Sequence, residues 1–302
     1  MKIWVPSDAV VEVLSDLPGL ECTVYDGTTA LPGDVADVEV WVPPLITVPD
    51  VPGTLARMSA LRLVQTVSAG VEQYRPHIPP GVVLCNARGV HDAGTAEWAV
   101  GAMIAVLREF PGFVDAQRDG EWTYHRTGVL ADSTVLIVGH GSIGAALERR
   151  LDGFEVDVVR VARTARDGVH GLDELPALLP AADVVVLLVP ATADTAGMVD
   201  AAFLARMKDG AVLVNAARGG VVDTEALLAE VKTGRLRAAL DVTDPEPLPA
   251  GHPLWSAPGV LITPHIAGST PASARRTLRL IRAQLGRHLA GESLDNVITD
   301  SY

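Results

Sequence analysis

A continuous apolar run leads directly into a glycine-rich turn in the middle of the chain, in the segment STVLIVGHGSIG at residues 133–144. Such a run, without polar interruptions, is typical of a strand that is buried on both faces of a parallel sheet. A helical pattern, AALERRLDG, follows the turn at 145–153. Because parallel strands need a crossover connection, usually a helix, this order predicts an α/β domain built on a parallel sheet.

The turn itself has the pattern Gly139-x-Gly141-x-x-Gly144. In this pattern the first glycine permits a tight turn, the second lets backbone N–H groups approach a pyrophosphate, and the third lets helix and strand pack closely. The N-terminus of the following helix adds partial positive charge. We therefore expect a dinucleotide cofactor, with contacts from the six residues of the turn, Gly139, His140, Gly141, Ser142, Ile143 and Gly144. For His140 two interpretations stay open, contact with a cofactor phosphate or exposure to solvent.

The end of the next predicted strand bears on which cofactor binds. The pattern expects an acidic residue there, bonded to the ribose hydroxyls of NAD. Asp157 comes too early, inside the strand, and Asp167 comes too late. Arg163, Thr164 and Arg166 stand at the strand end instead. Because guanidinium groups suit a 2′-phosphate, we favour NADP(H) over NAD(H). NAD(H) stays possible, with the two arginines as solvated loop charges.

Short apolar strands alternate with helical patterns on both sides of the turn, which predicts two parallel sheets. One series has strands at 2–7, 23–26, 38–44, 61–68 and 82–88 and helices at 7–17 and 53–60; the other has strands at 133–139, 157–163, 183–189, 211–217, 238–243 and 260–265 and helices at 145–153, 200–208 and 224–235.

Two longer helical patterns, at 91–109 and 270–290, are natural bridges between the two sheets. We expect Pro111 and Gly112 to end the first of these helices, residues 113–131 to be irregular, and the last ten residues to form a strand or a tail. The predicted domains are therefore 1–93 with 277–302, and an inserted domain at 94–276.

Composition excludes several classes of protein. The 302 residues carry a formal net charge of −13, which disfavours a nucleic-acid or anionic-membrane partner. Cys22 and Cys85 have no metal-ligand spacing, so we expect reduced thiols and no metal. The N-terminus lacks a signal-peptide pattern, and no apolar run is long enough for a membrane span, so we expect a cytoplasmic protein.

Three further segments place polar side chains directly after predicted strands. They are VLVNAARGGVVD at 212–223, ALDVTDPEPLP at 239–249 and HPLWSAPGVLITPHIAGST at 252–270. In open α/β sheets, ligands bind outside the carboxyl ends of the strands. Arg218, Glu246 and His265 are therefore expected to converge on one crevice.

With these motifs in place, the sequence resembles the D-isomer-specific 2-hydroxyacid dehydrogenase family over nearly its whole length. The resemblance rests on SAGVEQY at 68–74, GHGSIG, the run from LLVPATADTAG to ARGGVVD, DPEPLP and TPHIAGS, which follow one another in the family's order. It implies two doubly wound parallel-sheet domains, with a Rossmann nucleotide domain inserted into a flavodoxin-like substrate domain. It also implies hydride transfer between a nicotinamide cofactor and a 2-oxo acid.

The resemblance implies a role for each of the three polar residues. Arg218 matches the arginine of the family's ARGG motif, and its planar fork suits a carboxylate and a 2-oxo group. His265 matches the acid/base histidine, which would protonate the developing alkoxide during reduction. Glu246 matches the acid that stabilises the imidazolium and orients the ring. A charged proton donor favours the reductive direction.

The resemblance also implies further contacts. Backbone N–H groups of Ser68, Ala69 and Gly70 would bind the substrate carboxylate. The remaining cofactor contacts implied are Val189, Pro190 and Thr195 near the adenosine and ribose, Ala216 and Ala217 near the nicotinamide half, Asp241 facing the carboxamide, and His265 and Gly268. His125 and Trp255 are further candidates, for the mouth of the substrate site. His140 departs from the family, which often has an aliphatic residue there.

Several alternatives stay open. A phosphite-type dehydrogenase uses the same arginine, glutamate and histidine, and a nucleotide-sensing corepressor-like protein shares the architecture. The substrate ranges from glyoxylate and hydroxypyruvate to bulkier 2-oxo acids. The family is usually homodimeric through the nucleotide domain, so we expect a homodimer. The helix at 91–109, with Trp98, Met103 and Ile104, has enough apolar surface to be shared between subunits, although core packing explains it equally well.

Overall fold

The computed structural model describes residues 1–28, 31, 33–45, 48 and 50–299. The chain forms two compact units, Met1–His91 with Pro271–Tyr302, and Asp92–Thr270. The boundaries expected from the sequence, 93/94 and 276/277, fall inside helices α3 (Asp92–Leu107) and α9 (Pro271–Ala290). The division falls at the first residue of each helix, because each helix belongs whole to one unit. Residues 300–302, part of the expected C-terminal tail, lie outside the described residues.

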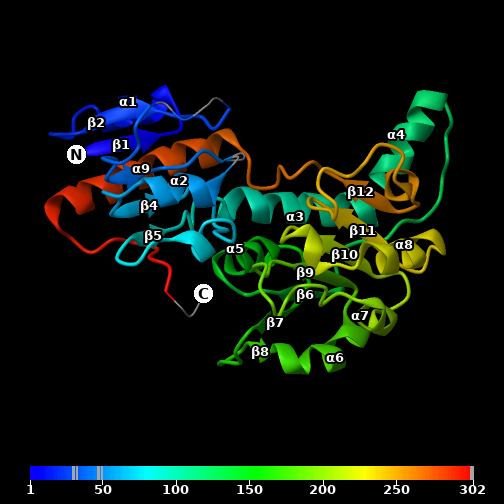
Figure 1. The fold of residues 1–302 in the computed structure, drawn as a ribbon. Helices are drawn as coiled ribbons and strands as arrows, with labels where there is room; N and C mark the ends of the chain where they lie inside the picture. Colours follow the sequence, from blue (N-terminus) through cyan, green and yellow to red (C-terminus); the bar gives the residue numbers. More distant parts are fainter. Residues whose placement is uncertain (29–30, 32, 46–47, 49, 300–302) are drawn as a thin grey trace. The chain divides into compact units, whose positions relative to one another are not determined.

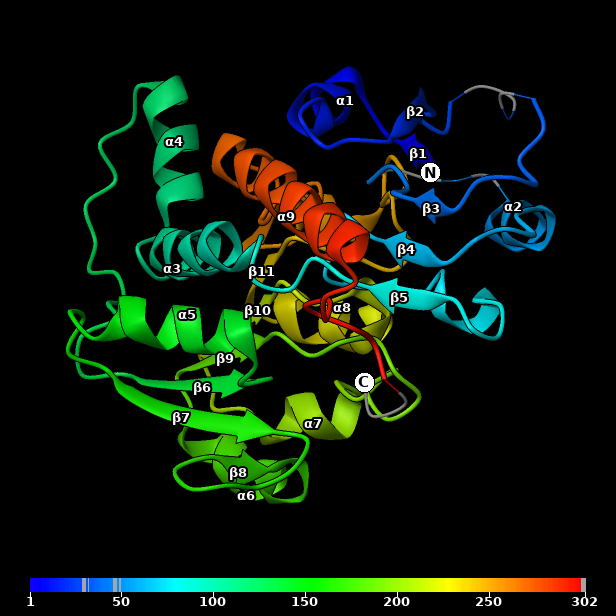
Figure 2. The same ribbon diagram turned by 90° about the vertical axis from the view of Figure 1, so that its left-hand side faces the viewer.

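The first unit contains a five-stranded parallel sheet in the order β2-β1-β3-β4-β5. This is the flavodoxin-like order that the resemblance implied. Helices α1 and α9 pack on one face of the sheet, and α2 packs on the other (Figure 2). The tail adds an antiparallel bridge between Val297 and Cys85. The elements are β1 (Lys2–Val5), α1 (Asp8–Leu14), β2 (Glu21–Val24), β3 (Val40–Trp41), α2 (Val51–Arg57), β4 (Leu63–Gln65), η1 (Arg75–His77) and β5 (Val83–Cys85).

The second unit contains a seven-stranded parallel sheet in the order β12-β11-β10-β9-β6-β7-β8. Six of these strands confirm the strands expected from the sequence. The chain order reverses between β6 and β9, which is the arrangement of a doubly wound nucleotide-binding sheet. The elements are β6 (Thr134–Val138), α5 (Ser142–Leu151), β7 (Asp157–Ala162), β8 (His170–Gly171), η2 (Leu172–Glu174), α6 (Leu175–Leu178), η3 (Leu179–Ala181), β9 (Val184–Leu187), α7 (Ala201–Arg206), β10 (Val212–Asn215), η4 (Gly219–Val221), α8 (Thr224–Lys232), β11 (Arg237–Leu240), η5 (Pro253–Ser256) and β12 (Val260–Ile262).

Both faces of this sheet are covered, as the uninterrupted apolar strands predicted. Helices α3 and α5 pack on one face and α6, α7 and α8 on the other (Figure 1). Met103 of α3 is fully buried, and Trp98 and Ile104 pack against the same core. Core packing therefore accounts for the apolar surface of this helix.

The expectations that Pro111 and Gly112 end a helix and that residues 113–119 are irregular were wrong, whereas residues 121–131 are irregular as expected. A second helix, α4, spans Phe110–Asp119, and Pro111 lies in its first turn. Proline is tolerated there because the first N–H groups of a helix have no intrahelical partner. Glu109, with φ of 55°, separates α3 from α4. The helix has apolar residues at helical spacing, Phe110, Phe113 and Val114, but it buries none of its residues within the unit, so this apolar face is not part of the core.

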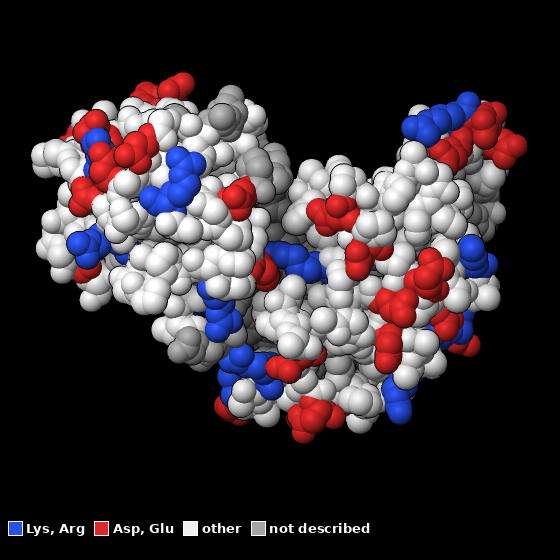
Figure 3. Space-filling model, viewed as in Figure 1, with Lys and Arg blue, Asp and Glu red and all other residues white. Residues whose placement is uncertain are grey.

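On the face shown in Figure 3, basic side chains form small groups among acidic ones. Among the described residues, no helix is both long enough and apolar enough to cross a membrane.

Candidate active site

The carboxyl ends of six neighbouring strands lie level with one another along one edge of the seven-stranded sheet. The in-register pairs run from Val161 through Val138, Leu187, Asn215 and Leu240 to Ile262. Neighbouring strands lie roughly 4.8 Å apart, so the segments that follow them form one continuous row. The glycine turn follows β6, the second strand of this row, beside the point where strand order reverses. The segments that carry Arg218, Glu246 and His265 follow β10, β11 and β12 at one end.

The glycine turn has the geometry that the sequence predicted. Gly139 has φ of 106°, and a Cβ there would lie 2.6 Å from the carbonyl carbon of Leu188. A Cβ on Gly144 would lie 2.6 Å from the Gly139 carbonyl oxygen. A side chain at either position would therefore displace backbone, which explains two of the three glycines by packing alone.

Gly141 differs from the other two glycines. A Cβ there would meet no atom within 4 Å, and its φ is −90°, so neither packing nor backbone conformation requires glycine. Gly141 is exposed and immediately precedes α5, whose first N–H groups have no intrahelical partner. The open space beside these donors fits a dinucleotide pyrophosphate, which needs close approach to backbone. Ser142 is held by a hydrogen bond from its Oγ to Asp92 Oδ1, at 3.2 Å.

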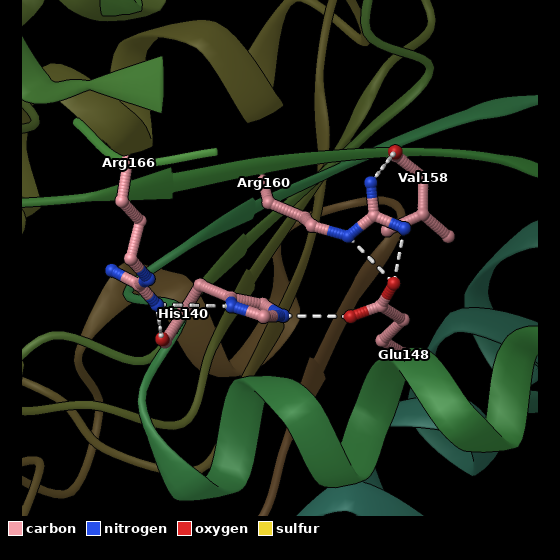
Figure 4. A network of polar contacts seen from close by, with 5 residues as sticks. All are labelled: His140, Glu148, Val158, Arg160 and Arg166. Atoms are coloured by element: carbon pink, nitrogen blue, oxygen red, sulfur yellow. Dashed lines mark hydrogen bonds and ion pairs between the residues drawn. The ribbon is translucent and has the colours of Figure 1, made fainter. Parts of the chain in front are cut away.

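The strand end next to this turn is basic, as predicted. Arg163, Thr164 and Arg166 are all exposed just after β7. Arg166 Nη2 donates to the His140 carbonyl oxygen at 2.7 Å (Figure 4). The arginine at the strand end is thus tied to the glycine turn, where a cofactor phosphate would have both within reach.

His265 and Glu246 form a close pair at the far end of the row. His265 Nδ1 lies 2.6 Å from Glu246 Oε1. Both side chains are about half exposed, at 50% and 41%. Because the carboxylate accepts the hydrogen bond, Nδ1 carries the proton and Nε2 remains for a substrate oxygen. The pair has the composition of a general acid/base with an orienting carboxylate.

The backbone at His265 is held in an uncommon conformation. Its φ of 55° is in the left-handed region, which side chains other than glycine rarely adopt. The buried carboxylate of Asp241 stabilises this turn by accepting three hydrogen bonds, from Thr263 Oγ1 at 2.6 Å and from the N–H groups of Ile266 and Ala267 at 2.9 Å each. Asp241 also accepts a bond from the His265 N–H through its carbonyl oxygen, at 2.8 Å. In this structure, Asp241 positions the histidine turn.

Arg218 precedes the short helix η4, and the backbone around it is packed closely. The buried Asn215 side chain donates to the Arg218 carbonyl at 3.0 Å and accepts from the Ala217 N–H at 3.0 Å. A Cβ on Gly219 would lie 1.9 Å from the Thr243 carbonyl oxygen. Glycine at 219 therefore lets the Arg218 turn contact the loop that leads to Glu246.

The other expected cofactor residues lie along the same row. Val189 and Pro190 follow β9, and Ala216 and Ala217 follow β10. The Thr195 hydroxyl is buried and donates to the Pro190 carbonyl at 2.6 Å, so it holds the turn after β9. Gly268 follows the histidine turn directly.

The three residues expected to bind the substrate carboxylate belong to the first unit. Ser68, Ala69 and Gly70 follow β4, and the turn is closed by a hydrogen bond from Ser68 Oγ to the Gly70 carbonyl at 2.7 Å. Asn86 Nδ2 donates to the Ala69 carbonyl at 2.7 Å. The loop is thus ordered by its own unit.

Two further candidates for the substrate mouth are placed on separate loops of the second unit. His125 bonds to Glu109 at 2.9 Å and stacks on Phe113 of α4. Trp255 lies in η5, and its Nε1 donates to the Pro249 carbonyl at 3.0 Å, in the loop that carries Glu246. No cluster of metal-ligating side chains occurs among the described residues.

Several positioning residues were not identified from the sequence. Asn215, Thr263 and Glu148 each hold a site segment, but each is a common residue type with no motif of its own. The clue that could have identified them is a polar residue at the end of a buried strand, such as Asn215, whose side chain is 1% exposed in the structure.

Comparisons with known proteins agree with this geometry. The family model for the NAD binding domain of D-isomer specific 2-hydroxyacid dehydrogenase matches residues 100–267. Glyoxylate reductase of Thermofilum pendens is 35% identical over 249 residues, which are 77% of this chain and 73% of that protein.

Two solved structures are similar over nearly the whole chain. A D-isomer specific 2-hydroxyacid dehydrogenase from Xanthobacter autotrophicus Py2, in complex with NADPH and MES, has a TM-score of 0.85 and 30% identity, covering 100% of this chain and 99% of that one. An NADPH-dependent glyoxylate/hydroxypyruvate reductase from Sinorhizobium meliloti, in complex with NADP and malonate, has a TM-score of 0.83 and 25% identity, covering 99% and 96%.

Proposed function

The chain belongs to the D-isomer-specific 2-hydroxyacid dehydrogenase family, a family of NAD(P)-dependent oxidoreductases, and on that premise we propose that it reduces a small 2-oxo acid with NADP(H). The observation that carries the proposal is the His265–Glu246 pair, with Nδ1 and Oε1 2.6 Å apart, in the same row as a dinucleotide turn. The similarity to glyoxylate and hydroxypyruvate reductases supports small 2-oxo acids as the substrate class.

His265 acts as the proton donor in this proposal. Its Nε2 faces the substrate oxygen and gives a proton to it as negative charge develops there. Glu246 stabilises the imidazolium before transfer and keeps the ring from rotating. When bound, the reduced nicotinamide supplies the hydride that completes the reduction. In the reverse direction, neutral His265 takes the hydroxyl proton.

Arg218 binds the substrate in this proposal. A guanidinium presents two parallel N–H groups, which can meet the carboxylate and the 2-oxo group of one substrate molecule. The backbone is fixed around it by Asn215 and by the close approach at Gly219. Because Arg218 is neighbour to the Glu246 loop, substrate orientation and proton donation come from adjacent segments. The role of Ser68, Ala69 and Gly70 in carboxylate binding stays a prediction.

A direct test measures the consumption of NADPH, and separately of NADH, with a panel of 2-oxo acids from glyoxylate and hydroxypyruvate to phenylpyruvate. We expect turnover with at least one member. Cofactor binding without turnover of any member would contradict the proposal, and formation of NAD(P)H from NAD(P)+ and phosphite would replace it.

The preference for NADP(H) rests on the basic strand end after β7. Replacing Arg163 and Arg166 together by glutamine should raise the Kd for NADPH about thirtyfold or more, because two charge-assisted contacts to a 2′-phosphate are lost. NADH lacks this phosphate, so its Kd should change less than about twofold. Isothermal titration of both cofactors measures the difference. An equal rise in Kd for NADPH and NADH would reject the phosphate site. Arg150→Gln, which removes a cation from α5, is the matched control.

We also propose the homodimer expected from the family, with a second copy covering α4 and the segment after it. This region leaves five large apolar side chains exposed, with Trp122 at 95% and Tyr124 at 87%; the others are Phe110, Val114 and Val129. Such a cluster is typical of a protein–protein interface. The cytoplasmic location stays a prediction.

The homodimer is tested by light scattering of the wild type and of a variant with Trp122→Ser and Tyr124→Ser. The wild type should have twice the 31.7 kDa chain mass, and the variant should shift toward a monomer. A monomeric wild type at micromolar concentration would contradict the dimer.

A further inference from the structure

Four polar side chains form a continuous chain of contacts from β7 across α5 to the glycine turn (Figure 4). Arg160 Nε donates to Glu148 Oε1 at 2.6 Å. The second oxygen of Glu148, Oε2, lies 2.7 Å from His140 Nε2. His140 Nδ1 lies 3.3 Å from Arg166 Nη2, which also donates to the His140 carbonyl. His140 thus connects a partly buried ion pair to the exposed arginine at the strand end.

The carboxylate in this chain is kept ionised. The Arg160 guanidinium is the largest cause that holds the pKa of Glu148 below its ordinary value, and the hydrogen bond with His140 adds to it. Side-chain exposure is 23% for Glu148 and 13% for His140, so water competes little for their contact. Glu148 is therefore a strong, fixed acceptor for the imidazole N–H.

The partners on both sides determine which His140 nitrogen carries the proton. Glu148 can only accept, so Nε2 is the donor. Arg166 can only donate, so Nδ1 presents its lone pair to Nη2. The neutral Nε2–H tautomer satisfies both contacts at once. In this form the ring and the carbonyl of His140 both hold Nη2 of Arg166.

Both described side-chain contacts of Arg166 use Nη2. One guanidinium nitrogen points away from His140 in Figure 4. The guanidinium is therefore oriented by the turn while another part of it faces outward. An exposed arginine loses rotamer freedom when it binds an anion, and an arginine already held in place loses less.

We propose that His140 is a positioning residue for cofactor selectivity, which holds Arg166 ready for the 2′-phosphate of NADP(H). The proposal rests on the NADP(H) preference proposed above. It assigns a role to the histidine of the glycine turn, for which the sequence left both phosphate contact and solvent exposure open. Arg160 and Glu148 act behind it, by fixing its tautomer and ring orientation.

The test measures binding of two adenosine fragments by isothermal titration, so that the readout does not depend on turnover. One fragment is adenosine 2′,5′-bisphosphate and the other is adenosine 5′-monophosphate, which lacks the 2′-phosphate. His140→Ala should raise the Kd for the bisphosphate about fivefold to tenfold, which is the effect of one lost orienting hydrogen bond. The Kd for the monophosphate should change less than twofold. If both fragments bind more weakly by the same factor, the proposal is overturned in favour of a direct contact with the 5′-phosphate that both fragments carry.

A double-mutant cycle separates positioning from direct contact. In an Arg166→Ala background, His140→Ala should have no further effect on bisphosphate binding, because its role acts through Arg166. If the two substitutions instead lowered bisphosphate affinity independently, so that their effects multiplied in the double variant, the proposal would be overturned.

Two conservative variants sharpen the result. His140→Asn keeps an acceptor near the position of Nδ1 and should restore most of the selectivity. His140→Gln keeps a donor toward Glu148 but no acceptor toward Arg166, and should not. If His140→Gln restored more of the selectivity than His140→Asn, the result would contradict the Nε2–H tautomer.

Failure of this inference is distinguishable from failure of the proposed preference. If the wild type does not discriminate between the fragments, the preference for NADP(H) itself is wrong and the inference falls with it. If Arg166→Ala loses discrimination and His140→Ala retains it, the inference alone is wrong. His288→Ala, on α9 of the other unit, is the matched control and should leave both affinities unchanged.

Discussion

Replacing His265 by alanine is expected to lower kcat for 2-oxo acid reduction by a hundred- to ten-thousand-fold. This is the usual range for removal of a positioned proton donor. The variant retains Arg218 and the glycine turn, so the Kd for NADPH should stay within about twofold. The measurement is the steady-state rate with the best substrate of the panel, together with cofactor titration.

A neighbouring variant completes this experiment. Glu246→Gln should lower kcat less, because the amide oxygen can still accept from Nδ1 while its charge is gone. His265→Ala with near-normal kcat would refute the assignment of the proton donor. The His288→Ala variant serves as the matched histidine control.

Replacing Arg218 by alanine is expected to lower kcat/KM roughly thirty- to five-thousand-fold. The change removes a charged partner from a bidentate contact, which costs about 2–5 kcal/mol, and each 1.36 kcal/mol is about tenfold in rate. KM should rise and kcat should fall together, since the contact both binds the carboxylate and orients the 2-oxo group. Full kinetics over a range of substrate concentrations separate the two parameters.

Lysine at the same position distinguishes geometry from charge. Arg218→Lys keeps a positive charge but loses the planar fork, so it should recover only a small part of kcat/KM. Arg206→Ala, which removes an exposed cation from the last turn of α7, is the matched control and should keep wild-type kinetics. An Arg218→Ala variant that matches this control would exclude Arg218 from the substrate site.

Local patterns predicted the fold well because they record local physical requirements. The apolar run at 135–138 is buried on both faces, and Gly139 and Gly144 lie where any side chain would meet backbone. The strand and helix order then leaves few topologies for two parallel sheets. Helix α4 was not predicted, because Pro111 and Gly112 were interpreted as the end of the preceding helix, whereas the structure places Pro111 in the first turn of a new one.

The sequence by itself determined which residues are chemically suited to the site and after which strands they come. It could not determine how they are held, because that depends on contacts between segments far apart in the chain. Three sets of contacts arise only when adjacent strands bring their ends level. They are the three hydrogen bonds from residues 263–267 to the Asp241 carboxylate, the 2.6 Å pair of Glu246 and His265, and the contacts that place His140 between Glu148 and Arg166. A motif specifies the residue types, whereas the parallel register of the sheet decides which of them meet.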